Sequence, residues 1–386
     1  MTISHLEQEE SSKRFFFILR LHNYIMRDFL LTDLEKVGPT TLIKLNNAGI
    51  FSPLDVVIRG AKEFERVSGL SEDMSVKHLI TMKKLLAEDG NDIEVTNLKQ
   101  LRELRKRQIK TPLKVEELDE MLKGGIETQS LYEIYGDEGC GKTQFSMTAM
   151  AEALGNGHGV LLLDCEGTFD EERFDEICKT RNITYDEEKL GYHMYSDESD
   201  LMRGVQNMTD ELIERDIRYV VIDGLVGLLR MANKGRGELA DRQQELKDYL
   251  KYLRNWSILF NIGVIITNQV TANPDPFGAK TKPIGGHVLG HYVKYIMSIS
   301  KGMKNNRTVR MIKSPKSPAG DYGCFVNEEG LSTFENLTKK ILADRMKDIH
   351  EDTQGLIKKD LLLEPLEEAG VDKRIINEDT GKIKVW

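Results

Sequence analysis

Residues 131–143 read LYEIYGDEGCGKT, an apolar run that passes directly into the pattern GxxxxGK[ST]. The apolar run predicts a buried strand, and the glycine-rich stretch behind it predicts a phosphate-binding loop that opens a helix. Glycines let successive backbone N–H groups surround a β-phosphate, Lys142 can reach the β and γ oxygens, and Thr143 can ligate Mg²⁺. A chance glycine-rich turn is the alternative, and the preceding strand disfavours it. We therefore expect a bound nucleoside triphosphate, contacted by Gly136, Asp137, Glu138, Gly139, Cys140, Gly141, Lys142, Thr143 and Gln144.

Further buried strands are predicted downstream, with longer amphipathic stretches between the earlier ones. This alternation indicates an α/β fold with a mixed, mostly parallel sheet. In open sheets of this kind, ligands lie beyond the carboxyl ends of the strands. Gly136, Asp164, Asp223 and Asn268 all fall at such ends, so we expect them at one site. The predicted strands are Leu131–Tyr135, Gly159–Asp164, Tyr219–Asp223, Gly263–Thr267, Tyr295–Ser300 and Thr308–Ile312.

Three strand-end side chains have the chemistry that hydrolysis of the γ-phosphate requires. Asp223 ends an apolar strand and is the predicted second Mg²⁺ anchor beside Thr143. Glu166 lies two residues beyond Asp164 and is the predicted general base for the attacking water. Gln269 is the predicted sensor of the γ-phosphate, reporting its loss to the following loop. A helix cap is the alternative for each residue taken alone, and their common placement on strand ends favours the catalytic interpretation.

Composition limits the class of protein. With 386 residues the chain is long enough for one large core and smaller satellites. No stretch has the roughly 20 apolar residues of a membrane span, and residues 1–12 are acidic and polar. We therefore expect a soluble intracellular protein without a membrane partner. The four cysteines, Cys140, Cys165, Cys178 and Cys324, show no CxxC spacing, which predicts reduced thiols and no structural zinc.

Charge is distributed unevenly along the chain. The net charge is −9, but residues 276–320 contain no Asp or Glu. A solvated charged face is the ordinary interpretation, and contact with phosphate or DNA is the interpretation we favour. The cations of this basic stripe are Lys280, Lys282, Lys294, Lys301, Lys304, Arg307, Arg310, Lys313 and Lys316.

Four regions are predicted along the chain: a helical domain (1–89), a polar linker (90–112), the ATPase core (113–335) and a C-terminal extension (336–386). In the first region, residues 34–50 predict two short helices joined by a glycine turn. Such a helix-hairpin-helix offers backbone N–H groups to a DNA phosphate without reading sequence; a plain turn in a helical bundle is the alternative. The apolar segment 15–19 is predicted to be core or a packing arm.

The C-terminal extension has mixed charge and no assigned activity. Its pattern predicts an amphipathic helix over 337–349 and a hairpin near 376–383. A cap packed on the core is favoured over a partner-binding arm.

Several motifs together resemble those of the RecA/RadA recombinase family, and in particular the archaeal RadA and eukaryotic branch with an N-terminal helix-hairpin-helix domain. The resemblance covers about 34–334 and keeps the order of the motifs. It implies a RecA-like core, ATP and Mg²⁺ as cofactors, and a helical homo-oligomeric filament with ATP between subunits. The motifs are GGIET (124–128), GDEGCGKTQ (136–144), DCEGTF (164–169), GRGEL (235–239), ITNQV (266–270) and PIGGH (283–287).

The resemblance also implies contacts for adenine and DNA. Arg173 would lie against adenine, although the usual basic residue is acidic at Asp170. Two segments, 230–243 and 270–283, would contact single- and double-stranded DNA, mainly through phosphates because Phe277 is the only ring in the second. The implied DNA contacts are Arg230, Arg236, Arg242, Val270, Asn273, Pro274, Lys280, Lys282, Gly285 and Gly286.

Two departures from the family pattern change the expectations. Lys313 replaces an aspartate of the RadA branch, so we expect its ammonium to replace a bound monovalent cation, with His291 and Pro318 completing the neighbour's cap over the nucleotide. A surface lysine is the alternative. The polymerisation motif, usually a Phe and an Ala three residues later, falls on Val95 and Leu98, with Ile93 as another anchor. A smaller buried surface predicts a weaker joint between subunits.

The resulting prediction is a DNA-dependent ATPase that performs homologous pairing and strand exchange in recombinational repair, located in the cytoplasm or nucleoid, or in the nucleus if the source is eukaryotic. One alternative is an accessory paralogue that acts as mediator or loader without exchanging strands, and mediators are also candidate partners. A structural DNA coat is a third class, but it would have little use for the catalytic residues.

Overall fold

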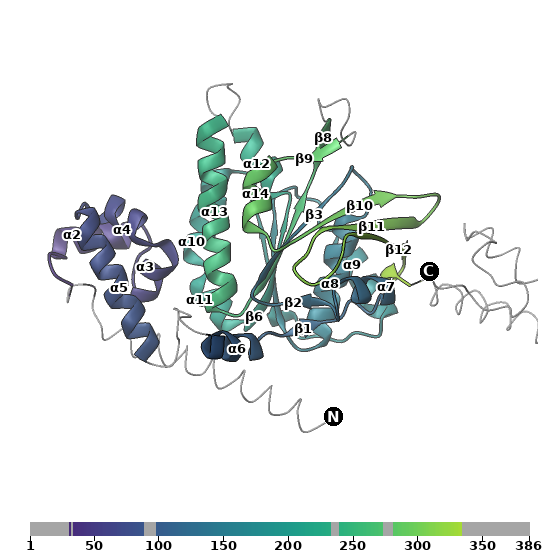
Figure 1. The fold of residues 1–386 in the computed structure, drawn as a ribbon, viewed down its shortest axis with the longest axis horizontal. Helices are drawn as coiled ribbons and strands as arrows, with labels where there is room; N and C mark the ends of the chain where they lie inside the picture. The colour runs from purple at the N-terminus through teal and green to yellow at the C-terminus, as the bar shows by residue number, and fades with distance from the viewer. Residues whose placement is uncertain (1–30, 32–33, 89–97, 233–238, 273–280, 334–386) are drawn as a thin grey trace, which may run out of the picture.

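The computed structural model describes residues 31, 34–88, 98–232, 239–272 and 281–333. Its centre is a nine-stranded sheet in the order β13-β12-β11-β10-β3-β7-β6-β4-β5 (Figure 1). The strands are β3 (Ser130–Tyr135), β4 (Gly159–Asp164), β5 (Leu190–Met194), β6 (Ile217–Asp223), β7 (Gly263–Asn268), β10 (Tyr295–Lys301), β11 (Asn306–Lys313), β12 (Gly320–Asn327) and β13 (Gly330–Ser332). From β10 to β5 neighbouring strands are parallel, and β11, β12 and β13 extend the sheet antiparallel. The sheet is mixed and mostly parallel, which confirms the predicted fold class.

Alternate residues of the central strands enter two different apolar cores. In β4, Leu161 and Leu163 belong to one core, and Val160 and Leu162 belong to the other. Successive side chains of a strand point to opposite faces, so both faces of the sheet are covered. This explains why the central strands are almost continuously apolar in sequence.

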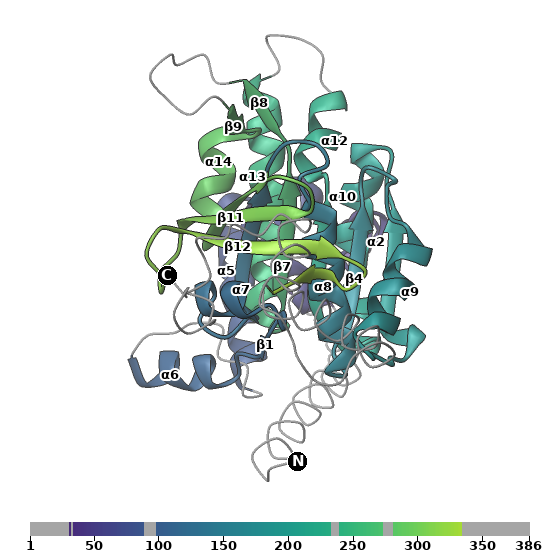
Figure 2. The same ribbon diagram turned by 90° about the vertical axis from the view of Figure 1, so that its right-hand side faces the viewer.

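Helices cover each face (Figure 2). On one face α8 packs across β4, β6 and β7 and also contacts α9, while α7 contacts β12. On the other face α13 and α14 contact β3, α11 contacts β6, and α12 contacts β7. The helices are α7 (Glu116–Met121), α8 (Lys142–Gly155), α9 (Glu171–Thr180), α10 (Glu198–Asn207), α11 (Thr209–Glu214), α12 (Leu225–Ala232), α13 (Leu239–Leu259) and α14 (Gly286–Tyr292), with a 3₁₀ turn, η2, at Glu187–Lys189.

Some elements were not predicted from the sequence. The edge strands β5 and β13, and β12 beside β13, belong to the main sheet, and two small sheets pair β1 (Lys110–Thr111) with β2 (Ile126–Glu127) and β8 (Val270–Ala272) with β9 (Thr281–Pro283). The segment predicted as linker contains a helix, α6 (Leu98–Lys106). Its positive charge suggested a solvated linker, but leucines at 98, 101 and 104 give it an amphipathic pattern.

The described part of the N-terminal region, residues 34–88, consists mainly of helices, but the helical pair predicted over residues 34–50 is wrong. Residues 34–36 form a bend and turn, and α2 is the one helix within residues 34–50; it begins at Pro39, whose fixed backbone suits the first position of a helix. A helix pair joined by a left-handed glycine occurs later, where Gly69 (φ +74°) separates two helices. The helices are α2 (Pro39–Asn47), α3 (Pro53–Arg59), α4 (Ala61–Ser68) and α5 (Glu72–Glu88).

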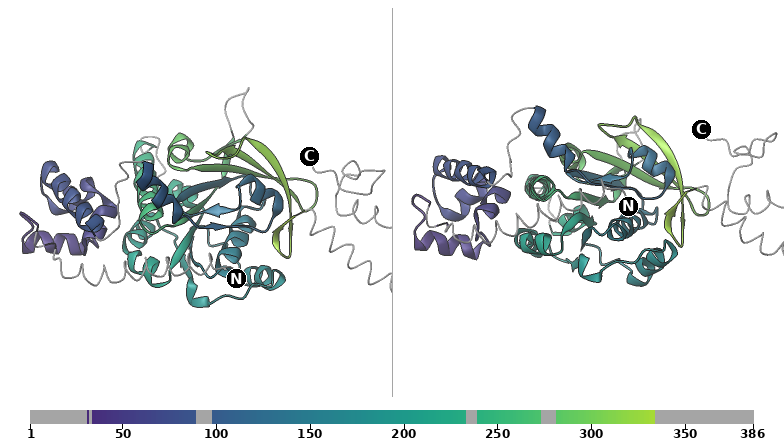
Figure 3. Two further views of the ribbon diagram at one scale, coloured as in Figure 1. Left: turned by 60° about the horizontal axis from the view of Figure 1, so that its bottom comes forward. Right: turned by 90° about the horizontal axis from the view of Figure 1, so that it is seen from below.

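These four helices lie against the α10–α13 side of the core (Figure 3). Polar contacts join the two parts: the Tyr252 hydroxyl donates to Glu63 (2.5 Å), Asn255 Nδ2 donates to the Ile58 carbonyl (2.6 Å), and Lys251 Nζ donates to the Arg59 carbonyl (3.2 Å). One cluster of buried apolar residues contains members from both parts. The helical domain is therefore packed on the core through apolar and polar contacts.

Other expectations concern whole-chain features. All four cysteines are free and buried, which agrees with reduced thiols. Among the described residues, no helix combines the length and apolar character needed to cross a bilayer. The segments 15–19 and 337–349, the hairpin near 376–383, and the anchors Ile93 and Val95 lie outside the described residues. Leu98 begins α6 and is 60% exposed.

Candidate active site

The phosphate-binding loop joins β3 to α8, as predicted. Gly139 (φ +69°) and Gly141 (φ +111°) adopt the left-handed conformation that glycine tolerates best. A Cβ on Gly136 would lie 2.2 Å from the Ile299 carbonyl oxygen, so this glycine allows the close approach of β10. Lys142 Nζ donates to the carbonyls of Gly136 and Asp137, both at 2.9 Å. The lysine ammonium is thus held at the mouth of a loop whose shape suits a chain of phosphates.

Asp223 and Thr143 meet at the start of α8. The Thr143 hydroxyl donates to Asp223 Oδ2 (3.2 Å), and Thr267, from the next strand, donates to Oδ1. Burial raises the pKa of Asp223, and the hydroxyl donors oppose that shift. A carboxylate and a hydroxyl that approach so closely at a phosphate loop are suitable ligands for Mg²⁺. The structure therefore brings together the two predicted metal-binding side chains.

Glu166 and Gln269 also lie together. Gln269 Nε2 donates to Glu166 Oε1 (2.9 Å), although the residues are 103 positions apart. Burial, and then the negative charge of Asp223, raise the pKa of Glu166. A carboxyl with a raised pKa is better suited to accept a proton near neutral pH. The predicted base and the predicted sensor are thus in direct contact.

The loop that carries Glu166 is held by the buried carboxylate of Asp164. Asp164 accepts hydrogen bonds from the backbone N–H groups of Glu166 (3.1 Å), Gly167 (2.7 Å) and Phe169 (3.1 Å). In the sheet, Asp164 pairs with Asp223. Strand pairing and loop hydrogen bonds therefore fix the predicted base beside the predicted metal-binding carboxylate.

Arg173, predicted to lie against adenine, is tied to the body of the protein. Its guanidinium donates to Gln144 Oε1 (2.8 and 3.1 Å) and to the carbonyl of Asn327, the last residue of β12. Asp170 caps α9 by accepting from the Arg173 N–H (3.0 Å). The acidic residue at position 170 is thus explained by its role as the N-cap of α9. The contact between Arg173 and adenine stays a prediction.

The predicted cap for a neighbouring subunit lies around α14 and β11. Lys313 Nζ donates to the carbonyls of Gly290 (2.7 Å) and Val293 (2.9 Å), where the negative end of the helix dipole favours a cation. His291 lies on the last turn of the same helix and is exposed, as is Pro318. Their role in a cap is untested by a single chain and stays a prediction.

A buried carboxylate anchors the loop that contains Pro318. Glu127 accepts from Lys294 Nζ (2.7 Å), from Lys316 Nζ and from the Tyr295 hydroxyl (2.7 Å). Burial alone would raise the pKa of Glu127, but the hydrogen bonds from Lys294 and Lys316 lower it to about 2. Lys294 and Lys316 of the basic stripe thus pair with a carboxylate of the same chain. Arg310 also pairs with Asp321, at an exposed position.

The described parts of the two segments predicted to contact DNA lie at one end of the molecule. Figures 1 and 2 show β8, β9, α12 and one end of α13 together there. Val270 pairs with Pro283, and Thr271 pairs with Lys282, whose side chain is exposed. Gly285 (φ +87°) precedes α14, which begins at Gly286. Arg230 and Arg242 are on α12 and α13, whereas Arg236, Asn273, Pro274 and Lys280 lie outside the described residues.

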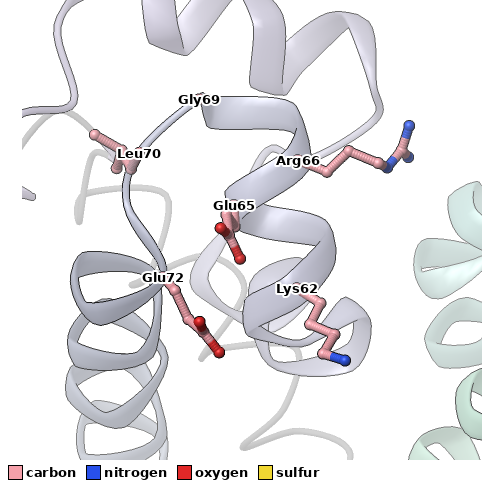
Figure 4. Close-up of a pocket in the computed structure, with 6 residues that line it drawn as sticks. All are labelled: Lys62, Glu65, Arg66, Gly69, Leu70 and Glu72. Atoms are coloured by element: carbon pink, nitrogen blue, oxygen red, sulfur yellow. The ribbon is translucent and has the colours of Figure 1, made fainter.

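A separate hollow lies on the helical domain, at the turn between α4 and α5 (Figure 4). Acidic residues lie beside the basic ones, and Glu72 and Asp73 occupy the first turn of α5. Negative charge at this helix start disfavours a phosphate ligand. The lining residues are Lys62, Glu65, Arg66, Gly69, Leu70 and Glu72.

Sequence reasoning missed some residues of the site. Thr267 binds Asp223, and Gly224 accommodates Glu166, since a Cβ on Gly224 would lie 2.3 Å from Glu166 Cγ. Glu133 accepts a hydrogen bond from Asn268 Nδ2 (2.8 Å), although only the strand-end position of Asn268 was noted. Thr267 precedes Asn268 and Gly224 follows Asp223, so their position in the sequence next to predicted site residues could have identified them.

A phosphate-binding loop at the end of a central parallel strand, with a predicted metal-binding carboxylate and a predicted base at neighbouring strand ends, is typical of P-loop ATPases with a RecA-like core. A family model described as Rad51 matches residues 104–334. The chain is also similar to the DNA repair and recombination protein RadA of Cenarchaeum symbiosum (strain A), with 35% identity over 331 residues, which is 82% of each chain. The protein belongs to the Rad51 family.

Proposed function

We propose that this protein is an ATP-dependent DNA recombinase that forms a helical filament on single-stranded DNA and exchanges strands with a homologous duplex. The observation that carries the proposal is the contact between Gln269 and Glu166. Gln269 immediately precedes β8, so the group that touches the base also opens the segment assigned to DNA. The similarity to a recombination protein supports the same function.

The site residues divide the work of ATP hydrolysis. Lys142 and the loop N–H groups bind the phosphates, while Thr143 and Asp223 would hold Mg²⁺, which neutralises phosphate charge when bound. Glu166 accepts a proton from the attacking water, and Gln269 orients that water or the γ-phosphate. Because Gln269 is fixed to β8, loss of the γ-phosphate would change the position of this segment and weaken its hold on DNA.

Subunit contacts complete the proposal. His291, Lys313 and Pro318 of one subunit would cover the nucleotide of the next, and the Lys313 ammonium would take the place of a monovalent cation. ATP binding would then stabilise both the filament and its grip on DNA. Phosphate contacts would make binding insensitive to sequence and weaker at high salt. Recombination mediators are further candidate partners.

The test uses purified full-length protein with ATP, Mg²⁺ and single-stranded DNA. We expect DNA-stimulated ATP hydrolysis, filaments in electron micrographs, and joint molecules with a homologous duplex. Hydrolysis and DNA binding without joint molecules would identify the mediator class instead. DNA binding without hydrolysis would indicate a structural coat and contradict the proposal.

A further inference from the structure

Asn268, at the end of β7, has no part in the ATP hydrolysis or DNA contacts proposed above, although its hydrogen bonds join several segments. Asn268 is the last residue of β7 and only 1% exposed. Its backbone carbonyl accepts from the N–H of Gly136, the first residue of the phosphate loop (3.3 Å). One residue is therefore bonded to the nucleotide loop and covalently bonded to the sensor Gln269.

The side chain of Asn268 makes two further connections. Its Nδ2 donates to the carbonyl of Ile284 (2.7 Å) and to Glu133 Oε1 (2.8 Å). Ile284 directly follows β9, and its own N–H donates to the Gln269 carbonyl (3.0 Å). The entry and exit of the β8–β9 segment are thus fastened to each other and, through one amide group, to β3.

Glu133 fixes the orientation of the Asn268 side-chain amide. It lies on β3, three residues before Gly136, and is 2% exposed. Among the described residues, the only hydrogen bond to its carboxyl group is the one from Asn268. An amide that donates both protons to buried acceptors cannot rotate without leaving one of them unpaired, which costs about 1–3 kcal/mol.

We propose that Asn268, oriented by Glu133, is a positioning residue that couples the nucleotide site to the β8–β9 DNA segment. The inference rests on the proposed function for the identity of that segment. Displacement of Gln269 by the γ-phosphate moves Ile284 as well, because the Ile284 N–H is bonded to the Gln269 carbonyl and the side chain of the adjoining Asn268 holds the Ile284 carbonyl. Both ends of the β8–β9 segment then move together when the γ-phosphate binds, and not only the end at Gln269.

The experiment compares Asn268→Ala with Asn261→Ala in the full-length protein. Asn261 is the control: it is buried, lies two residues before β7 begins, and donates from Nδ2 to a backbone carbonyl (Arg107, 2.6 Å) while accepting from Thr128. We expect the ratio of DNA-stimulated to DNA-independent ATP turnover to fall at least about fivefold in Asn268→Ala and to stay within about twofold of wild type in Asn261→Ala.

A second pair of variants, at Glu133, tests the inference even if Asn268→Ala does not fold. Glu133→Gln keeps an oxygen that accepts from Asn268 and should retain the ratio, whereas Glu133→Val removes it and should lower the ratio. Equal ratios in these two variants would overturn the inference. So would an unchanged ratio in folded Asn268→Ala.

Hydrogen exchange separates this inference from the proposed function. A non-hydrolysable ATP analogue should increase protection of the peptide containing Ile284 in wild type and in Asn261→Ala, but not in Glu133→Val. This readout requires no DNA. If wild-type hydrolysis proves independent of DNA, the proposed function fails, while the exchange data still decide whether Asn268 couples the nucleotide to Ile284.

Discussion

Gly224 leaves room for Glu166, the proposed catalytic base. Its φ of +85° favours glycine, and an added Cβ would lie 2.3 Å from Glu166 Cγ and 2.7 Å from Oε1. We predict that Gly224→Ala lowers ATP turnover at least about tenfold, since a misplacement of about 1 Å can lower a rate by about a hundredfold. ATP binding, measured by fluorescence of a labelled analogue, should change much less, because the phosphate loop is untouched.

Gly157→Ala is the matched control for this change. Gly157 has a similar φ of +80°, but an added Cβ meets nothing within 4 Å. Both variants introduce backbone strain of about 1 kcal/mol, and only one displaces Glu166. Equal losses of turnover in the two variants would mean that strain, and not the position of the base, limits the reaction.

Glu133 should make stability depend on pH. Burial raises its pKa from 4.5 to about 7. Between these values the folded chain keeps a proton that the unfolded chain releases, so this group's contribution is complete below about 4.5 and is lost as the pH rises toward 7. We predict that Glu133→Gln reduces this decline, by at most about 3 kcal/mol.

Urea unfolding of wild type and Glu133→Gln at pH 5, 6, 7 and 8 measures the effect. The difference between the two proteins isolates Glu133 from other titrating groups, including Glu198, whose pKa burial also raises to about 7. Parallel stability curves across this range would show that Glu133 does not hold its proton.

At the scale of elements, Arg181 fastens three parts of the core around α9. Its guanidinium donates to Glu152 of α8 (2.6 Å), to the Leu113 carbonyl (2.8 Å) and to the Glu329 carbonyl before β13 (2.7 Å). Glu152 is only 1% exposed, so the loss of Arg181 leaves a buried charge with Lys114 as its remaining cation. We predict that Arg181→Met destabilises the protein by about 3 kcal/mol in urea unfolding.

Arg215→Met tests whether the loss of any ion-paired arginine would destabilise the protein as much as the loss of Arg181. Arg215 also pairs with a glutamate, Glu211, but one third of its side chain is exposed. Exposed pairs contribute about 0–1 kcal/mol, so the control should change the unfolding midpoint little. A loss in Arg215→Met as large as in Arg181→Met would contradict the assigned role of burial.

The same scale shows what the sequence can predict. Strand β4 was predicted over its full length because both of its faces are buried and nearly every residue is apolar. Strand β12 escaped because Gly320, Asp321, Gly323 and Asn327 have low strand propensity and its place in the sheet comes from pairing with β11. Local pattern therefore identifies the apolar central strands and misses polar strands nearer the edges, whose place tertiary pairing defines.

For the site, local sequence was sufficient where a residue ends an apolar strand. Asp223 and Glu166 follow such strands, and parallel packing brings their ends together. Glu133 gave no signal, because a polar residue within LYEIY looks like the solvent side of a strand. Its partner Asn268 is 135 positions away, and only the register of β3 with β7 brings the two together.

At the scale of the whole molecule, the position of the helical domain depends on contacts with α10 and α13. Glu63 accepts from the Tyr252 hydroxyl (2.5 Å) and from Gln206 Nε2 (3.3 Å), and the buried Arg59 donates to the Gln206 carbonyl (3.3 Å). Each such hydrogen bond contributes about 1 kcal/mol. Loss of several from the core side should shift the domain toward undocked positions while its own fold persists.

We predict that the variant Tyr252→Phe, Asn255→Ala increases the radius of gyration in small-angle X-ray scattering and speeds proteolysis between the two parts. Tyr249→Phe, Asn261→Ala is the matched control, because Tyr249 is one turn away on α13 and donates to the Glu198 carbonyl (2.7 Å) inside the core. The variant and the control remove comparable buried hydrogen bonds, but only the first pair contacts the helical domain. An unchanged radius in the first variant would mean that apolar packing alone holds the domain, and an equal increase in both would indicate general loosening of the core.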